Sequence, residues 1–319
     1  MTMLLVKNRL WQVWCDFWFS PRAANTLAVI RIFCGAMIAY IHLVWLMRVS
    51  DFFGPNAFVG RETVRALHQN EYRWTYLWYI DSTAFLITHE LIAVLCGCLM
   101  CVGLLTRLTV PLSWFLTLMV CHRATGYLFG LDQVVMMLAM YLMIAPSGSV
   151  WSLDAWWRDK KIPRLPTWLF PNDAPATMTT IATRLIQCHL AVVYLFGGIG
   201  KLRGEMWWDG SAMWFALASY EYQSFDGTWL GRYPFLLSVV THVTLFWEVF
   251  YCALVWPRWS RYFILGMAVV MHAGIAIFLG MITFGFMMIV ANLAFIEPEI
   301  TRRISRAALR LIAPKSLGT

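Results

Sequence analysis

Two groups of titratable side chains stand at the ends of long apolar stretches of this chain. One group closes the stretches at about 108–121 and 131–146, and the other follows the stretch at about 178–200. Their members are His122, Arg123 and Asp132 in the first group, and Lys201, Arg203, Glu205 and Asp209 in the second. A lysine that is partly withdrawn from water gives up its proton more readily and can act as a general base. This pattern predicts a pocket for proton abstraction, with Lys201 as the base.

Aromatic and polar neighbours complete the predicted pocket. Trp207 can form an apolar wall for a flat ring. His272 enters an apolar stretch at about mid-depth and either reaches the floor of the pocket or is a core histidine. We therefore expect the pocket to open to the extracytoplasmic side and to be lined by Lys201 with some of His122, Arg123, Asp132, Trp207, Asp209 and His272.

The remaining histidines have a more ordinary expected role. His42, His189 and His242 are predicted to be hydrogen-bonded core residues, whereas His68 and His89 are expected in loops or at an interface. Cys96, Cys98 and Cys101 are close in sequence, but positions 96 and 98 diverge by about 200° around a helix. We therefore expect these cysteines to serve helix packing and predict no metal site.

The composition identifies the elements that must hold these side chains. Of 319 residues, 60% are hydrophobic and only 13% are charged, and the mean hydropathy is +0.63. Such a chain lacks the polar surface that a soluble globular enzyme needs. It contains 18 Trp residues, a type that is enriched at membrane–water interfaces. The composition thus predicts an integral membrane protein.

The apolar stretches predict an all-α, polytopic bundle of about eight transmembrane helices, with seven or nine as alternatives. The expected spans are about 24–46, 84–104, 108–121, 131–146, 178–200 and 235–256, with two more inside 262–297 that turn near Gly280. Residues 1–23 are predicted to be a cytoplasmic interfacial segment, 24–300 one transmembrane domain, and 301–319 a basic cytoplasmic tail. Two segments, about 47–83 and 201–234, are expected to lie as short helices against the bundle.

The charge distribution predicts the orientation of the bundle. With eight spans and the N-terminus inside, 15 Lys and Arg residues fall on the inner side and 8 on the outer side. Because cytoplasmic loops carry the excess of Lys and Arg, both termini are predicted to be cytoplasmic. The net charge of +8 is then explained by loops that face anionic lipid, and no nucleic acid is expected as a partner. The expected location is a plasma or inner membrane.

Charged residues within the predicted spans include Arg31, Arg184 and Glu248. Arg31 and Arg184 carry positive charge, and Glu248 carries negative charge. An unpaired charge at that depth costs at least about 2.5 kcal/mol on insertion scales. We therefore expect Arg31 or Arg184 to meet Glu248 or another polar partner, with a structural Arg31–Glu248 pair as the favoured arrangement.

The segment YLFGGIGKLRGEMWWDGSAM at 194–213 resembles the horizontally transferred transmembrane domain (HTTM) family, which includes the membrane part of vitamin K-dependent γ-glutamyl carboxylase. Segments 27–55, 122–154 and 272–299 are also similar to that family, so the resemblance covers roughly residues 20–300. It implies that Lys201 matches the lysine that deprotonates vitamin K hydroquinone. His122 is then a stand-in for the catalytic histidine that precedes a Tyr-Leu-Tyr-Gly-Leu run, to which YLFGL at 127–131 is similar.

Two functions stay open at this point. The first is a carboxylase-like or quinone-linked membrane enzyme, which acts on a quinone-type lipid such as vitamin K hydroquinone or modifies an exported peptide at the extracytoplasmic face. The second is a non-catalytic protein that binds a lipid, a peptide or a partner. Lys201 in its motif favours the enzyme, whereas the short stretch of about 20 residues after the last span favours binding.

Overall fold

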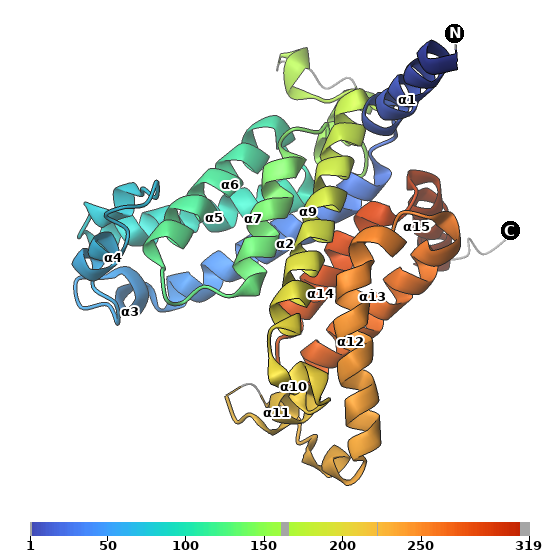
Figure 1. The fold of residues 1–319 in the computed structure, drawn as a ribbon. Helices are drawn as coiled ribbons and strands as arrows, with labels where there is room; N and C mark the ends of the chain where they lie inside the picture. Colours follow the sequence, from blue (N-terminus) through green and yellow to red (C-terminus); the bar gives the residue numbers. More distant parts are fainter. Residues whose placement is uncertain (1, 161–165, 222, 313–319) are drawn as a thin grey trace, which may run out of the picture. The chain divides into compact units, whose positions relative to one another are not determined.

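A computed structural model of the chain describes residues 2–160, 166–221 and 223–312, and its regular elements are helices (Figure 1). Within these ranges there is no β-strand, only an isolated bridge between Arg22 and Ala176. The expected all-α class is confirmed. The chain divides into two compact units, one comprising Met1–Arg184 with Ile296–Thr319 and the other Leu185–Phe295.

The first unit holds the N-terminal helices and the last one. Its long helices are α1 (Thr2–Phe19), α2 (Asn25–Met47), α5 (Thr83–Val102), α6 (Thr106–Arg123), α7 (Gly130–Leu142) and α15 (Pro298–Ile312). Its short ones are α3 (Val49–Phe53), α4 (Arg61–Leu67), η1 (Tyr76–Trp78), α8 (Leu153–Asp159) and η2 (Thr167–Leu169). The part of the expected tail at 313–319 lies outside the described residues.

The second unit contains residues 194–213, which include Lys201. Helix α9 (Thr177–Leu202) enters it at residue 185, and its other long helices are α12 (Pro234–Leu254), α13 (Arg258–Phe278) and α14 (Ile282–Asn292). The short ones are α10 (Glu205–Trp208), α11 (Ala212–Ala218), η3 (Thr228–Arg232) and η4 (Leu293–Phe295). The segments at 47–83 and 201–234 therefore form short helices, as expected.

All eight predicted apolar stretches are helical. Five are long and apolar enough to cross a membrane, namely α2, α5, α9, α12 and α13; a sixth is possible if Ile282–Phe295 and Pro298–Ala307 form one broken span. Helix α7 has 13 residues, a length of about 20 Å, which is shorter than the apolar core of a bilayer at about 30 Å. The structure thus supports a multi-pass membrane protein with five to six candidate spans.

The turn between the last two apolar helices lies where the sequence placed it. Helix α13 ends at Phe278 and α14 begins at Ile282. Between them Gly280 adopts a φ of +68°, a conformation that other residues rarely take. The apolar run has no charged break, so this glycine is the residue that divides it.

Helices α2 and α5 approach each other closely through glycine. A Cβ atom added to Gly35 would lie 2.5 Å from the backbone nitrogen of Cys101, and one added to Gly97 would lie 2.7 Å from that of Ala39. Small residues let two helix backbones meet in this way, which is common among membrane helices. Cys96 is buried and Cys98 exposed, so these neighbouring cysteines point in different directions, as predicted.

Arg31, in the first unit, forms hydrogen bonds with carbonyl oxygens at the C-terminal end of α5. It is fully buried, and its guanidinium donates to the carbonyl oxygens of Met100 (2.9 Å), Cys101 (3.3 Å) and Trp151 (2.6 Å). The last carbonyls of a helix have no partner within the helix, so a cation placed there both pairs them and suits the helix dipole. The charge of Arg31 therefore serves the turn after α5.

Candidate functional site

Lys201 forms an ion pair in the second unit. Its Nζ donates to Oε2 of Glu248 on α12 at 2.6 Å, and the two side chains are 27% and 16% exposed. Gly197 lies one turn before Lys201 on α9, and a Cβ atom there would come within 3.3 Å of the same Oε2. The absence of a side chain at 197 leaves room for the carboxylate beside the lysine.

Trp207 closes over the same pair. Lys201 Nζ lies 5.3 Å from the centroid of the Trp207 ring, within the range of a cation–π interaction. Helix α10, which carries Trp207, begins at Glu205 after a break at Gly204, so the chain turns back soon after α9 ends. The predicted proximity of Lys201 and Trp207 is therefore present.

A chain of buried hydrogen bonds joins four helices of the second unit, including the two that carry Lys201 and Glu248. Asn292 Nδ2 donates to the Tyr194 hydroxyl (2.9 Å), which lies 2.8 Å from His272 Nε2, and the Tyr251 hydroxyl donates to Asn292 Oδ1 (2.6 Å). The rings of Tyr194 and Tyr251 also pack together, with centroids 4.1 Å apart. Helices α9, α12, α13 and α14 each contribute one member of this network.

The network lies within electrostatic reach of the ion pair. Tyr194 precedes Lys201 by seven residues on α9, and Glu248 precedes Tyr251 by three on α12, so each pair shares a helix face. Lys201 has a coulombic interaction with His272, and Glu248 has one with Tyr194. The second unit thus holds an amine, a carboxylate and a hydrogen-bonded imidazole in one region.

This arrangement is suited to proton transfer. The carboxylate can take a proton from the ammonium, which leaves a neutral amine able to accept one from an acidic hydroxyl. The indole of Trp207 offers a flat apolar face next to that amine.

Asp209 makes its hydrogen bonds to Ser211 and not to Lys201 or Glu248. Its Oδ1 accepts from the backbone nitrogen (2.8 Å) and the hydroxyl (2.6 Å) of Ser211, and these bonds hold the pKa of its carboxyl below the usual value. Asp209 also lines a pocket of about 530 Å³ together with Trp214, Arg232 and Ser238. Asp209 therefore stabilises the turn before α11 and belongs to the wall of this second pocket.

The other three predicted residues belong to the first unit, where each has a local partner. His122 Nδ1 lies 2.8 Å from the carbonyl oxygen of Trp74, and the buried Arg123 donates from Nη1 to the carbonyl of Val59 at 3.2 Å. Asp132 Oδ2 accepts from the backbone nitrogen of Phe129 at 3.0 Å, at the start of α7. His122 and Arg123 hold the segment at 47–83, and Asp132 caps a helix.

The expected partner of Glu248 was wrong. Glu248 pairs with Lys201, and Arg31 bonds to backbone carbonyls. Arg184 donates to the carbonyl of Phe17 at 3.0 Å and covers the Phe17 ring. Both arginines thus have a polar partner, as the cost of a bare charge in a membrane requires.

The first unit contains a buried polar cluster, formed by His42, His89, Glu90 and Thr117, that was not expected from the sequence. His42 Nδ1 lies 2.6 Å from Glu90 Oε2 and its Nε2 lies 2.9 Å from the Thr117 hydroxyl, so the expected core role of His42 is confirmed. His89 is buried in α5, 3.5 Å from Glu90 Oε1, rather than in a loop. Its position next to Glu90 in an apolar run is the signal that could have found it.

Tyr76 covers this cluster from outside the spans. Its ring meets that of His89 edge-on at 5.8 Å. Burial raises the pKa of Tyr76 to about 12, and the nearby charge of Glu90 adds to the effect. The phenol therefore stays neutral at physiological pH and supports the cluster by packing.

Comparison of the chain with protein-family models, curated proteins and solved structures gives no match. What the structure supports directly is a class: an all-helical, multi-pass membrane protein, with five to six candidate spans among the residues that the structure describes. Its second unit carries a partly exposed lysine–glutamate pair.

Proposed function

We propose that this protein is a membrane enzyme of the HTTM type that performs base-assisted chemistry on a quinone-type lipid at the extracytoplasmic face. The observation that carries the proposal is the Lys201–Glu248 pair, with 2.6 Å between Nζ and Oε2 and with both side chains partly exposed. A charged pair at the end of an apolar helix is costly to maintain, and such residues are functional candidates by default.

Each residue of the pair has a defined task in the proposed reaction. A reduced quinone such as vitamin K hydroquinone would supply an acidic hydroxyl. Glu248 first takes a proton at Oε2 from the Lys201 ammonium. The neutral Lys201 amine then takes the hydroxyl proton at Nζ, and the ammonium that forms stabilises the negative charge left on the hydroquinone oxygen. Trp207 would provide the apolar face against which a flat ring lies. Tyr194 and His272, which are 2.8 Å apart at OH and Nε2, would support this region by their hydrogen bond.

The test is a comparison of Lys201→Ala with Arg203→Ala in purified protein. Loss of a positioned general base is expected to lower turnover of a reduced quinone by about 10²–10⁴-fold. Arg203 is exposed on the same segment and shares the positive charge, so its variant should keep turnover within about twofold of the wild type because it takes no part in proton transfer. The measurement is the consumption of reduced vitamin K, followed by ultraviolet absorbance, in buffer that contains dissolved dioxygen as the acceptor of its two electrons. Undiminished turnover in Lys201→Ala would exclude Lys201 as the base.

A second candidate function is non-catalytic lipid binding. It is favoured by the mutual pairing of Lys201 and Glu248 and by the hydrogen bonds that join Tyr194, Asn292 and Tyr251, because such a network also stabilises a bundle. Under this function a quinone-type lipid co-purifies with the protein and is detected by mass spectrometry. The reduced quinone is then not consumed by either the wild type or the variant.

A further inference from the structure

A pocket of about 450 Å³ lies in the first unit, outside the site described above. Three parts of the chain line it: the start of α2, residues in 149–159 (which include α8) together with Asp173 and Pro175, and α15. Its lining carries three arginines and two aspartates, namely Arg158, Arg302, Arg306, Asp159 and Asp173. We call it the arginine pocket.

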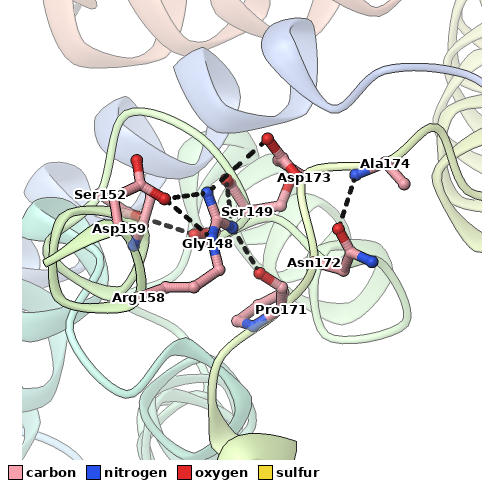
Figure 2. A network of polar contacts seen from close by, with 10 residues as sticks. Gly148, Ser149, Ser152, Arg158, Asp159, Pro171, Asn172, Asp173 and Ala174 are labelled. Atoms are coloured by element: carbon pink, nitrogen blue, oxygen red, sulfur yellow. Dashed lines mark hydrogen bonds and ion pairs between the residues drawn. The ribbon is translucent and has the colours of Figure 1, made fainter. Parts of the chain in front are cut away.

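Arg158 is committed to holding one wall of this pocket. Its Nη1 donates to the carbonyls of Ser149 (3.1 Å) and Pro171 (2.7 Å), and its Nη2 lies 3.0 Å from Asp159 and 4.0 Å from Asp173 (Figure 2). The guanidinium therefore ties α8 to the segment around residue 172. Its single positive charge offsets one of the two aspartates, and Arg302 and Arg306 leave the lining with a net charge of +1.

Helix α15 presents the other arginines to the pocket. Arg302, Ser305 and Arg306 are spaced by three and four residues, so they share one helix face, and all three line the pocket. Thr301 next to them bonds to Thr26 of α2, with 2.9 Å between the hydroxyl oxygens, which holds α15 against the start of α2. Among the described residues neither Arg302 nor Arg306 has an acidic partner, so their charge is available to a ligand.

The start of α2 adds further positive potential. Asn25 and Ala23 line the pocket, and α2 begins at Asn25 with no acidic residue in its first turn. The first N–H groups of a helix lack partners within the helix and carry partial positive charge. This 23-residue helix therefore directs an anion-attracting end at the same space as the two arginines.

We propose that the arginine pocket binds a phosphate group, in the form of a lipid headgroup or of free phosphate. The fork of a guanidinium matches phosphate oxygens, the hydroxyl of Ser149 can donate to them, and a helix N-terminus favours their charge. A volume of about 450 Å³ accommodates such a group. The inference is independent of the chemistry proposed for Lys201.

Neighbouring arginines on α15 allow a matched test. Arg302→Gln and Arg306→Gln each remove a charge from the pocket lining, whereas Arg303→Gln removes the same charge from an exposed position outside it. The full chain in phosphatidylcholine nanodiscs is titrated with inorganic phosphate by calorimetry. In a second arm, added phosphatidic acid is detected on the detergent-solubilised protein by native mass spectrometry. Thermal unfolding of each variant shows that it is folded.

The expected result is a loss of affinity of about tenfold for Arg302→Gln and Arg306→Gln, the value of one charge-assisted hydrogen bond, with Arg303→Gln within about twofold of wild type. Binding of phosphatidic acid alone would assign the pocket to lipid headgroups, and binding of inorganic phosphate would assign it to the free ion. Equal losses in all three variants would mean general attraction to a basic helix and would overturn the proposal. So would a lack of binding in both arms.

Discussion

Two carboxylates inside apolar helices are each held 2.6 Å from a nitrogen, but their exposure differs. Glu90 and His42 are 2% and 0% exposed, whereas Glu248 and Lys201 are 16% and 27% exposed. A fully closed pair has no route by which a substrate can reach it, so it serves the bundle. A partly open pair can exchange a proton with a ligand, which is the physical reason for assigning the proposed chemistry to Lys201.

The closed pair leads to a prediction about stability. Glu90→Leu leaves His42 buried without its carboxylate and is expected to lower the free energy of unfolding by about 2 kcal/mol. Glu71→Leu removes the carboxylate from a second histidine pair, with His68, in which Glu71 is 48% exposed; its cost should stay below about 1 kcal/mol. Reversible unfolding in mixed micelles, followed by tryptophan fluorescence, measures both. Equal costs would contradict a structural role for the buried cluster.

At the scale of elements, glycines decide how closely the helices of the first unit approach. Gly35 and Gly97 bring the backbones of α2 and α5 together, and this contact places His42 on α2 opposite Glu90 on α5. Gly266 on α13 has a different setting, because a Cβ atom there would meet nothing within 4 Å. The same residue type thus has opposite consequences in the two helices.

This contrast predicts opposite effects of the same substitution. Gly97→Ala forces a methyl group against the backbone of Ala39 and should cost about 1–3 kcal/mol. Gly266→Ala is expected to leave stability unchanged or to raise it by up to about 1 kcal/mol, since alanine favours helix. The midpoint of thermal unfolding in detergent distinguishes them. If Gly97→Ala were as stable as the wild type, the α2–α5 contact would be looser than the structure has it.

At the scale of the whole molecule, apolar length and charge together give the membrane arrangement. Five helices are long and apolar enough to cross a bilayer, and α12 and α13 expose large apolar side chains such as Phe235 (82%) and Phe263. Exposed apolar surface of this extent suits contact with lipid. With the eight spans expected from the sequence, 15 Lys and Arg residues would lie on the inner side and 8 on the outer side.

The charge asymmetry predicts that both termini are cytoplasmic. A phosphatase reporter fused after Thr319 should be inactive, and a fluorescent reporter at the same place should be bright, because the former works only outside the cytoplasm and the latter inside it. The same pair of fusions placed after Asp226 should give the reverse result, because the segment at 201–234 is expected outside. Phosphatase activity from the fusion after Thr319 would overturn the orientation.

The sequence by itself determined the helical class and the limits of the long spans. The stretches expected at 24–46 and 178–200 are helices at Asn25–Met47 and Thr177–Leu202, and the turn near Gly280 is where it was expected. These features follow from apolar length and from local breaks, which are properties of consecutive residues. The proximity of Trp207 to Lys201 could be predicted for the same reason, since Trp207 follows Lys201 by only six positions in the chain.

Only the tertiary structure decided which buried groups meet. Glu248 was expected beside Arg31 but pairs with Lys201, and His89 was expected in a loop or at an interface but is buried beside Glu90. Such pairs of side chains depend on how each helix is rotated about its own axis and on how far it is shifted along that axis relative to its neighbours. Rotation and depth are set by packing, as at Gly35 and Gly97 between α2 and α5, and packing joins residues far apart in the chain.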